Sequence, residues 1–419
     1  MRPDPTTHAA VTAPSARPLF RRASALALAA VAAGVAGLVG GCASEPPPPP
    51  PRNEVVAVEP GSFKVAWRVS VDTARDGEII SLHRLDDSVY AYTREKVVQA
   101  VTTGGGRTQF VTRVARPDDT VYPPVTLDAD GRAGGVEQVL AFPTGWGFTL
   151  LGPDGRLIKE TRLPASLTTA AAVTNDNQVL IGAADDNGGR LLKVDPLLPN
   201  GHITERVLLD GALAGRPAFQ GSRAFAADLE GKAYGMTSVL RQAWTIRAFQ
   251  TEMGRAVTAP VVADDYGVYI AGTDGTLNVL SRERGRILWR YFAGQPLYQE
   301  PVPVGDYVYQ AVLNRGVVAL PKYDGSRNSR DPAWIAEDAY AFLSHDDRNV
   351  YLVQQDGRIA AHDKKTGEKL FVSQRSDFSR FARNVDGPRI FAATRSGEFV
   401  AIDPVTGRGE VGEVAMVLP

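Results

Sequence analysis

Side chains that could support catalysis or bind a metal ion are few and scattered in this chain of 419 residues. Its histidines include His83, His202, His345 and His362, and none belongs to a His-x-x-x-His or Cys/His cluster. Such spacings are what allow one local element to place two ligands on a metal ion. The chain also lacks a Gly-x-Ser-x-Gly sequence. We therefore predict no catalytic residue, no metal site and no cofactor, although distant side chains could still converge at one place in the fold.

Two short motifs resemble ligand-binding loops without completing them. Asp128-Ala129-Asp130-Gly131 matches the beginning of a calcium loop, but no glutamate follows at the spacing needed for bidentate binding. Gly104-Gly105-Gly106 is glycine-rich like a phosphate loop, but no helix-forming segment follows it. We predict that both motifs are hairpin turns.

The one cysteine of the chain, Cys42, lies in a context that indicates lipidation. Arg21 and Arg22 precede an apolar stretch, 23–41, that ends in small residues immediately before Cys42. This pattern resembles the lipobox of bacterial lipoproteins, and an uncleaved membrane anchor is the alternative. We therefore predict that residues 1–41 are a signal peptide and that Cys42 is the lipidated residue. Ala43 and Ser44 in place of an aspartate imply an outer-membrane destination for such a lipoprotein.

A proline-rich linker follows the cysteine. Pro46–Pro51 are six consecutive prolines, which favour a stiff polyproline II segment. We expect residues 42–55 to hold a folded domain, residues 56–419, away from the lipid surface. Without residues 1–41 the chain keeps 46 − 4 = 42 basic and 47 − 1 = 46 acidic residues, a net charge of −4. This charge favours neither nucleic acid nor an anionic membrane as a partner, so the predicted membrane contact is the lipid alone.

A repeat of 40 to 50 residues organises the rest of the chain. Each repeat contains a pair of β-branched, aromatic or small apolar residues on a predicted second strand, and a glycine turn usually follows. The pairs are Val89-Tyr90, Val139-Leu140, Val179-Leu180, Ala224-Phe225, Val268-Tyr269, Val308-Tyr309, Val350-Tyr351 and Ile390-Phe391. The turn glycines are Gly155, Gly189, Gly231, Gly275, Gly316, Gly357 and Gly397. We predict an all-β, eight-bladed β-propeller of four-stranded antiparallel blades, with seven blades as the alternative because residues 118–163 are irregular.

The tryptophans indicate how the ring closes. Trp244, Trp289 and Trp334 are spaced 45 residues apart, each on a predicted fourth strand. Trp67 lies 244 − 67 = 177 residues before the first of them, which is close to four repeats. Trp67 therefore belongs to a fourth strand that precedes the first complete blade. We expect Lys64–Val71 to pair with the last blade and so remove the open sheet edges.

The segments around these tryptophans resemble the tryptophan-docking repeat of the PQQ-like propellers. The resemblance lies in Leu277–Trp289, in Ile359–Phe371, where phenylalanine replaces the tryptophan, and in Phe399–Gly407. In that family an Ala-x-Asp-x-x-Thr-Gly turn and an aromatic ring pack between neighbouring blades. The residues to which the resemblance assigns blade docking are Trp67, Trp244, Trp289, Trp334, Gly285, Asp363, Gly367, Asp403 and Gly407. Ser281 and Pro321–Gly325 depart from the pattern, so we expect rebuilt turns there.

The resemblance also bears on function. Quinoprotein dehydrogenases of this fold class have a pair of adjacent cysteines over the quinone, whereas this chain has a single cysteine. A lipid-anchored, eight-bladed PQQ-like propeller resembles the lipoproteins of the outer-membrane β-barrel assembly machinery. The resemblance implies a non-catalytic periplasmic scaffold, anchored to the outer membrane, whose partner is an outer-membrane barrel-assembly subunit. The stretch 325–338, with Arg327 and Arg330, is a candidate for the partner surface.

Another function remains open from the sequence. A degenerate quinoprotein, or a propeller that binds a carbohydrate or another small ligand, would use the central channel. Such a protein should gather carboxylates or cations at one mouth of the channel.

Overall fold

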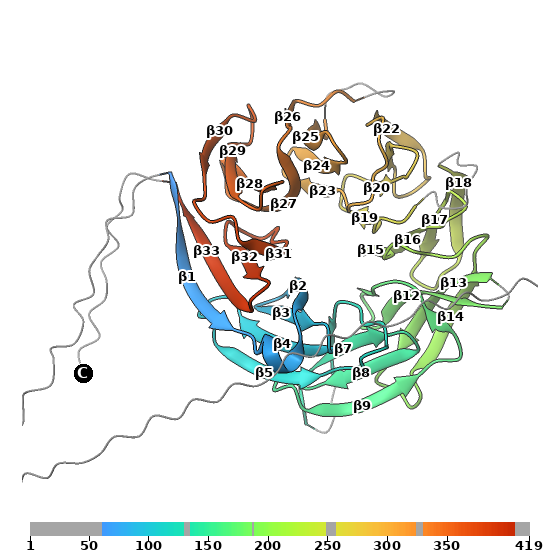
Figure 1. The fold of residues 1–419 in the computed structure, drawn as a ribbon. Helices are drawn as coiled ribbons and strands as arrows, with labels where there is room; N and C mark the ends of the chain where they lie inside the picture. The colour runs from blue at the N-terminus through green and yellow to red at the C-terminus, as the bar shows by residue number, and fades with distance from the viewer. Residues whose placement is uncertain (1–60, 130–134, 187, 249–256, 324–329, 407–419) are drawn as a thin grey trace, which may run out of the picture. The chain divides into compact units, whose positions relative to one another are not determined.

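The computed structural model describes residues 61–129, 135–186, 188–248, 257–323 and 330–406. The chain divides into two units, residues 1–56 and 57–419, and all described residues belong to the second. Its strands form eight antiparallel sheets, arranged as blades around a common axis (Figure 1). The eight-bladed β-propeller is therefore confirmed, and the seven-bladed alternative is wrong.

The blades are numbered in chain order. Blade 1 contains β2 (Ile79–Leu85), β3 (Ser88–Thr93), β4 (Val97–Thr102) and β5 (Thr108–Arg113). Blade 2 contains β6 (Val125–Asp128), β7 (Gln138–Thr144), β8 (Gly147–Leu151) and β9 (Leu157–Arg162). Blade 3 contains β10 (Ser166–Leu167), β11 (Ala172–Val173), β12 (Val179–Asp185), β13 (Gly188–Asp195) and β14 (His202–Leu208). Blade 4 contains β15 (Ala218–Gln220), β16 (Arg223–Ala227), β17 (Lys232–Thr237) and β18 (Gln242–Arg247).

The second half of the ring repeats this order. Blade 5 contains β19 (Val262–Ala263), β20 (Val268–Ala271), β21 (Thr276–Leu280) and β22 (Ile287–Phe292). Blade 6 contains β23 (Val302–Val304), β24 (Tyr307–Val312), β25 (Gly316–Pro321) and β26 (Trp334–Ala336). Blade 7 contains β27 (Ala339–His345), β28 (Asn349–Gln354), β29 (Ile359–Asp363) and β30 (Lys369–Val372). Blade 8 contains β31 (Phe378–Ala382), β32 (Ile390–Thr394), β33 (Glu398–Val405) and β1 (Ser62–Ser70).

The position of a strand within its blade decides its burial. The second strands β3 and β28 are buried at every position, because neighbouring blades cover both of their faces. The fourth strands β5 and β18 are largely exposed and bury mainly one residue each, Phe110 and Trp244. Aromatic side chains on the outer strands therefore seal the seams between blades.

Six of the seven turn glycines belong to the turn between the second and third strands or to the beginning of the third strand. Gly231, Gly275, Gly357 and Gly397 lie in the turn, and Gly189 and Gly316 lie at the beginning of β13 and β25. Gly275, Gly357 and Gly397 have φ of 85°, 84° and 95°, a region that disfavours side chains, so glycine suits these turns. Gly155 is the exception, because it lies between the third and fourth strands of blade 2, β8 and β9. The turn that corresponds to the other six contains Gly145, between β7 and β8. The assignment of Gly155 was therefore wrong, and this explains its irregular spacing.

The irregularity of the early repeats has a structural cause in blade 3. Its first strand is divided into β10 and β11, which both pair with β12. In blade 2 the first strand, β6, is short and ends at Asp128, whereas β7 begins at Gln138. The blade count remains eight because every blade keeps its second, third and fourth strands.

The first and last strands of the domain close the ring together. β1 pairs with β33 in antiparallel register from Ser62↔Val405 to Ser70↔Glu398. Trp67 lies opposite Ala401 on this outer strand. Figure 1 shows the blue β1 beside the red β33. The predicted closure by an N-terminal strand is confirmed.

Antiparallel order gives the propeller two faces with different connections. The connections between blades and the turns between second and third strands lie on one face, here named the crossover face. The turns between first and second strands and between third and fourth strands lie on the opposite face. The single helix that the described ranges contain, α1 (Thr73–Asp76), follows β1 and is far too short to span a bilayer.

Candidate functional site

Three of the predicted docking tryptophans pack against a glycine turn of the next blade. A Cβ atom on Gly367 would lie 2.5 Å from Cγ of Trp334, and one on Gly285 would lie 2.6 Å from Cε3 of Trp244. The indole of Trp334 donates to the carbonyl of Lys364 at 2.8 Å. These contacts leave no room for a side chain at either glycine.

Trp67 makes the same contact at the ring closure, with a glycine that the sequence analysis did not select. A Cβ atom on Gly106 would lie 2.6 Å from Cγ of Trp67, and the Trp67 indole donates to the carbonyl of Thr103 at 3.0 Å. The corresponding ring in blade 1 is Phe110, which packs on Gly155 of blade 2. A signal was present in the sequence: Gly106 follows Trp67 by 39 residues, and Gly285 follows Trp244 by 41.

Trp289 is completely buried, and its contacts differ from those of the other three tryptophans. Its indole nitrogen lies 3.1 Å from the hydroxyl of Tyr266, and the guanidinium of Arg330 lies 4.8 Å from the ring centroid. Arg330 also donates to the carbonyl of Lys322 at 3.0 Å. Arg330, which precedes β26 of blade 6, therefore supplies a cation where the other three tryptophans meet a glycine. Arg330 is only 2% exposed, so its assignment to a partner surface was wrong, while Arg327 lies outside the described residues.

The remaining predicted docking residues differ in the contacts that they make. Asp363 caps its turn, since its carboxylate accepts from the backbone amides of Lys365 and Thr366 at 2.9 and 2.8 Å. Asp403 instead forms a two-pronged ion pair with Arg389, with both distances 2.7 Å. Gly407 and the predicted lipidation site Cys42 lie outside the described residues.

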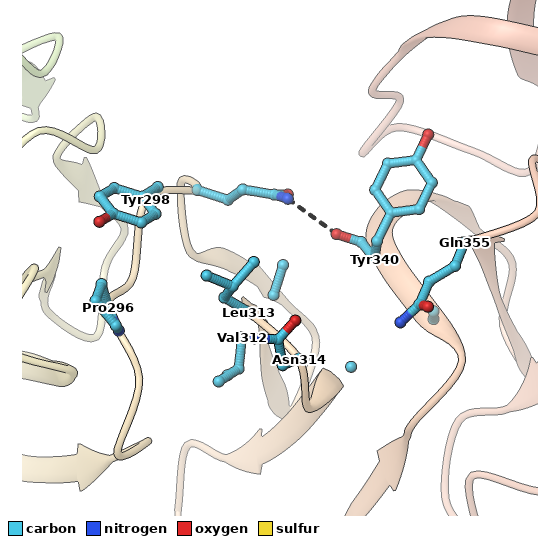
Figure 2. A pocket seen from close by; sticks show the side chains of 11 residues that line it. Pro296, Tyr298, Val312, Leu313, Asn314, Tyr340 and Gln355 are labelled. Carbon is cyan, nitrogen blue, oxygen red and sulfur yellow. Dashed lines mark hydrogen bonds between the residues drawn. The ribbon is translucent and has the colours of Figure 1, made fainter.

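A pocket opens on the crossover face between blades 6 and 7. Its volume is about 250 Å³, and Figure 2 shows Tyr298, Leu313 and Tyr340 around it. Tyr298 precedes β23, Leu313 lies in the turn after β24, and Tyr340 belongs to β27. The side-chain amide of Gln299 donates to the carbonyl of Tyr340 at 2.9 Å and so links the two blades across the pocket (Figure 2).

Next to this pocket, one carboxylate holds two arginines from distant blades. Glu300 follows Gln299 and lies 2.7 Å from Arg216 and 2.9 Å from Arg383. Glu300, Arg216 and Arg383 adjoin the first strands of blades 6, 4 and 8, so the ion pairs link alternate blades near the axis. Burial, with a smaller contribution from Arg216, lowers the pKa of His83 to about 4. His83 is therefore neutral near pH 7, and the arginines supply the positive charge.

This arrangement suits binding better than catalysis. Among the described residues, no three His, Cys, Asp or Glu side chains come together in a way that could hold a metal ion. The carboxylate of Glu300 is engaged by two guanidinium groups, so its oxygens are already occupied by ion pairs. The sequence reasoning missed this cluster because its members lie in three different blades.

Comparison with known proteins assigns the family. The family described as outer membrane protein assembly factor BamB matches residues 176–333 and 294–411, together 411 − 175 = 236 of 419 residues. The chain belongs to this family of PQQ-like propellers. Outer membrane protein assembly factor BamB of Kangiella koreensis is 29% identical over 120 residues. That match spans 26% of this chain and only 30% of the relative's length.

Solved structures share the fold of this family member. BamB from Moraxella catarrhalis superposes with a TM-score of 0.60 at 15% identity, over 81% of this chain and 99% of that one. The C-terminal WD40 domain of Sif2 gives a TM-score of 0.59 at 14% identity, over 83% of this chain and 99% of that domain. At such identities the likeness concerns the fold alone, since a propeller with different loops can serve a different function.

Proposed function

We propose that this protein is a non-catalytic scaffold that assists the assembly of β-barrel proteins in the outer membrane. The family match over residues 176–411 carries this proposal. The proposed partner is an outer-membrane barrel-assembly subunit, and the propeller would contact it through loops on one face. The crossover face is suited to this role because large apolar side chains remain exposed there, including Trp146, Tyr298 and Leu313.

The proposed location follows from the segment before the propeller. Lipidation of Cys42 would tether the domain to the outer membrane, and residues 42–55 would hold it in the periplasm. A Cys42→Ala variant should lose incorporation of a labelled fatty acid, while the wild-type protein is labelled. Labelling of both forms would refute the assignment of the anchor.

The scaffold role is tested by purification of the tagged full-length protein from native membranes in a mild detergent. We expect co-purification of the barrel-assembly subunit, and a deletion strain should contain less folded barrel protein in its outer membrane. Expression of the Cys42→Ala variant tests whether the anchor is needed for the same effect. Normal barrel assembly in the deletion strain, with no assembly subunit bound, would overturn the proposal.

A further inference from the structure

Exposed apolar side chains gather at one point of the crossover face. Tyr298, Leu313 and Tyr340 are 57%, 53% and 39% exposed, and all three line the pocket between blades 6 and 7. Large apolar groups that cluster around a concave site usually mark a place where another molecule binds. The pocket volume of about 250 Å³ exceeds the roughly 150 Å³ of a protein cavity that accepts benzene, so one aromatic side chain fits.

Hydrogen bonds hold the wall of this pocket in place. Gln299 donates to the carbonyl of Tyr340, and the buried Gln310 donates to the carbonyl of Gln299 at 3.0 Å. The segment that carries Tyr298 is therefore tied to both flanking blades. A wall that is already ordered loses little conformational entropy when a ligand binds.

The same segment connects the pocket to the arginines near the axis. Glu300 follows Gln299 and is shared by Arg216 and Arg383, whose side chains are 41% and 33% exposed. One carboxylate neutralises only one of these two guanidinium charges. Arg380 adds a third cation near Tyr340, because its charge opposes the rise that burial causes in the pKa of Tyr340.

We propose that the pocket and these arginines form one binding site for an extended polypeptide segment. The segment presents an aromatic side chain to the pocket and an adjacent carboxylate to Arg216 and Arg383. This inference rests on the proposed scaffold function and specifies the chemistry of the partner. Charge complementarity selects the acidic residue, because guanidinium groups pair strongly with carboxylates and each arginine here shares its present partner.

The probe is the octapeptide Gly-Ser-Thr-Phe-Asp-Thr-Ser-Gly with fluorescein at its amino end and an amide at its carboxyl end. The peptide part has one carboxylate, that of the aspartate, and the asparagine peptide carries the same label and so controls for the charge of the dye. Binding to the full-length protein in lipid nanodiscs is followed by fluorescence anisotropy. We expect saturable binding, and replacement of the phenylalanine by alanine should weaken it about tenfold, as truncation of an aromatic anchor does. Replacement of the aspartate by asparagine should also weaken binding.

Variants of the protein separate a direct contact from a structural effect. Tyr298→Ser and Leu313→Ser change exposed residues and should each weaken binding, whereas Leu208→Ser, at a 59% exposed position on the outer strand of blade 3, should leave it unchanged. Arg216→Gln should weaken binding of the aspartate peptide and leave the asparagine peptide unaffected, as expected for interacting partners in a double-mutant cycle. Arg190→Gln, which changes an arginine paired with Asp185 in blade 3, is the matched control.

Three results would overturn the proposal. They are the absence of saturable peptide binding, equal losses for both peptides with Arg216→Gln, and displacement of the probe by a neutral oligosaccharide instead of by the unlabelled peptide. The outcome is distinguishable from that of the scaffold test. Failure to retain the assembly subunit would leave peptide binding measurable, and failure to bind the peptide would leave co-purification of the subunit intact.

Discussion

Two seams between blades begin with the same residue type and are completed in different ways. Trp334 of blade 6 packs on Gly367 of blade 7 and donates to a backbone carbonyl. Trp289 of blade 5 meets the Arg330 guanidinium and the Tyr266 hydroxyl instead. The first seam depends on the absence of a side chain, and the second depends on a buried cation. A repeated fold can therefore conserve the position of a ring while the surface that receives it changes.

Removal of each ring should show the largest difference between the two seams. We expect Trp289→Ala to lower the free energy of unfolding by about 5 kcal/mol and Trp334→Ala by about 3 kcal/mol, within the range for buried aromatic truncations. Trp289 is completely buried, and its removal also takes away the ring that faces Arg330. Urea denaturation followed by circular dichroism measures both. Phe292→Ala, at a 67% exposed position, is the control, and equal losses at the two seams would contradict the comparison.

A methyl group in the glycine seam should come next in effect. Gly367 has φ of 73°, and its Cβ would collide with Trp334, so Gly367→Ala should cost about 3 kcal/mol from backbone strain and overpacking. Gly294 has a similar φ of 72° with no atom within 4 Å of its Cβ position. Gly294→Ala should therefore cost only about 1 kcal/mol, the backbone contribution alone. Thermal unfolding of the two variants separates the contribution of backbone strain from that of overpacking. Similar losses of stability would show that the contact with Trp334 contributes little.

Substitution of the buried Arg330 should affect only the seam at Trp289. Arg330→Met keeps an unbranched side chain over Trp289 but removes the guanidinium and its hydrogen bond to Lys322. We expect a loss of about 2 kcal/mol, the size of a desolvated cation–π contact. Arg330→Lys should not restore stability, because an ammonium cannot stack as a guanidinium does. Full rescue by lysine in urea denaturation would mean that charge alone stabilises the seam.

The smallest expected effect concerns pH. Burial would raise the pKa of Asp264, but the Lys322 ammonium 2.9 Å away and the Gly267 amide outweigh it and hold the pKa below its ordinary value of 3.8. A lowered pKa stabilises the fold above about pH 4, and this contribution is lost as the pH falls through the folded-state value. Asp264→Asn should therefore cost about 1 kcal/mol at pH 7, a partly exposed pair being worth less than a fully buried one. Unfolding curves at pH 7 and pH 3 measure this difference, which should shrink at pH 3.

The features that recur from blade to blade could be predicted from the sequence, whereas features that occur in a single blade could not. The eight residue pairs on the second strands were sufficient to predict eight blades, and the early position of Trp67 was sufficient to predict the closing strand. Both features depend on the regular spacing of residues along the chain and on the pairing of adjacent strands. Arg330 had no such signal, because it follows an insertion and meets Trp289 only after the two blades pack.

The candidate binding site was unpredictable for a related reason. Tyr298, Leu313 and Tyr340 come from a connection, a turn and a strand of two blades, and Arg216 comes from a third. No spacing along the chain relates them. Gly155 shows a different error, because it was assigned to the turn after the second strand of blade 2, whereas that turn contains Gly145.

The pairing of β1 with β33 has a consequence for how the protein acquires its structure. Ser62 and Val405 are partners although 405 − 62 = 343 residues separate them. The hairpins of seven blades can form from neighbouring residues, but the eighth blade stays incomplete until both ends of the domain are available. Contacts between such distant residues slow folding. While the ring is open, the β33 edge is unpaired and can pair with another chain, and the addition of β1 is the step that removes this edge.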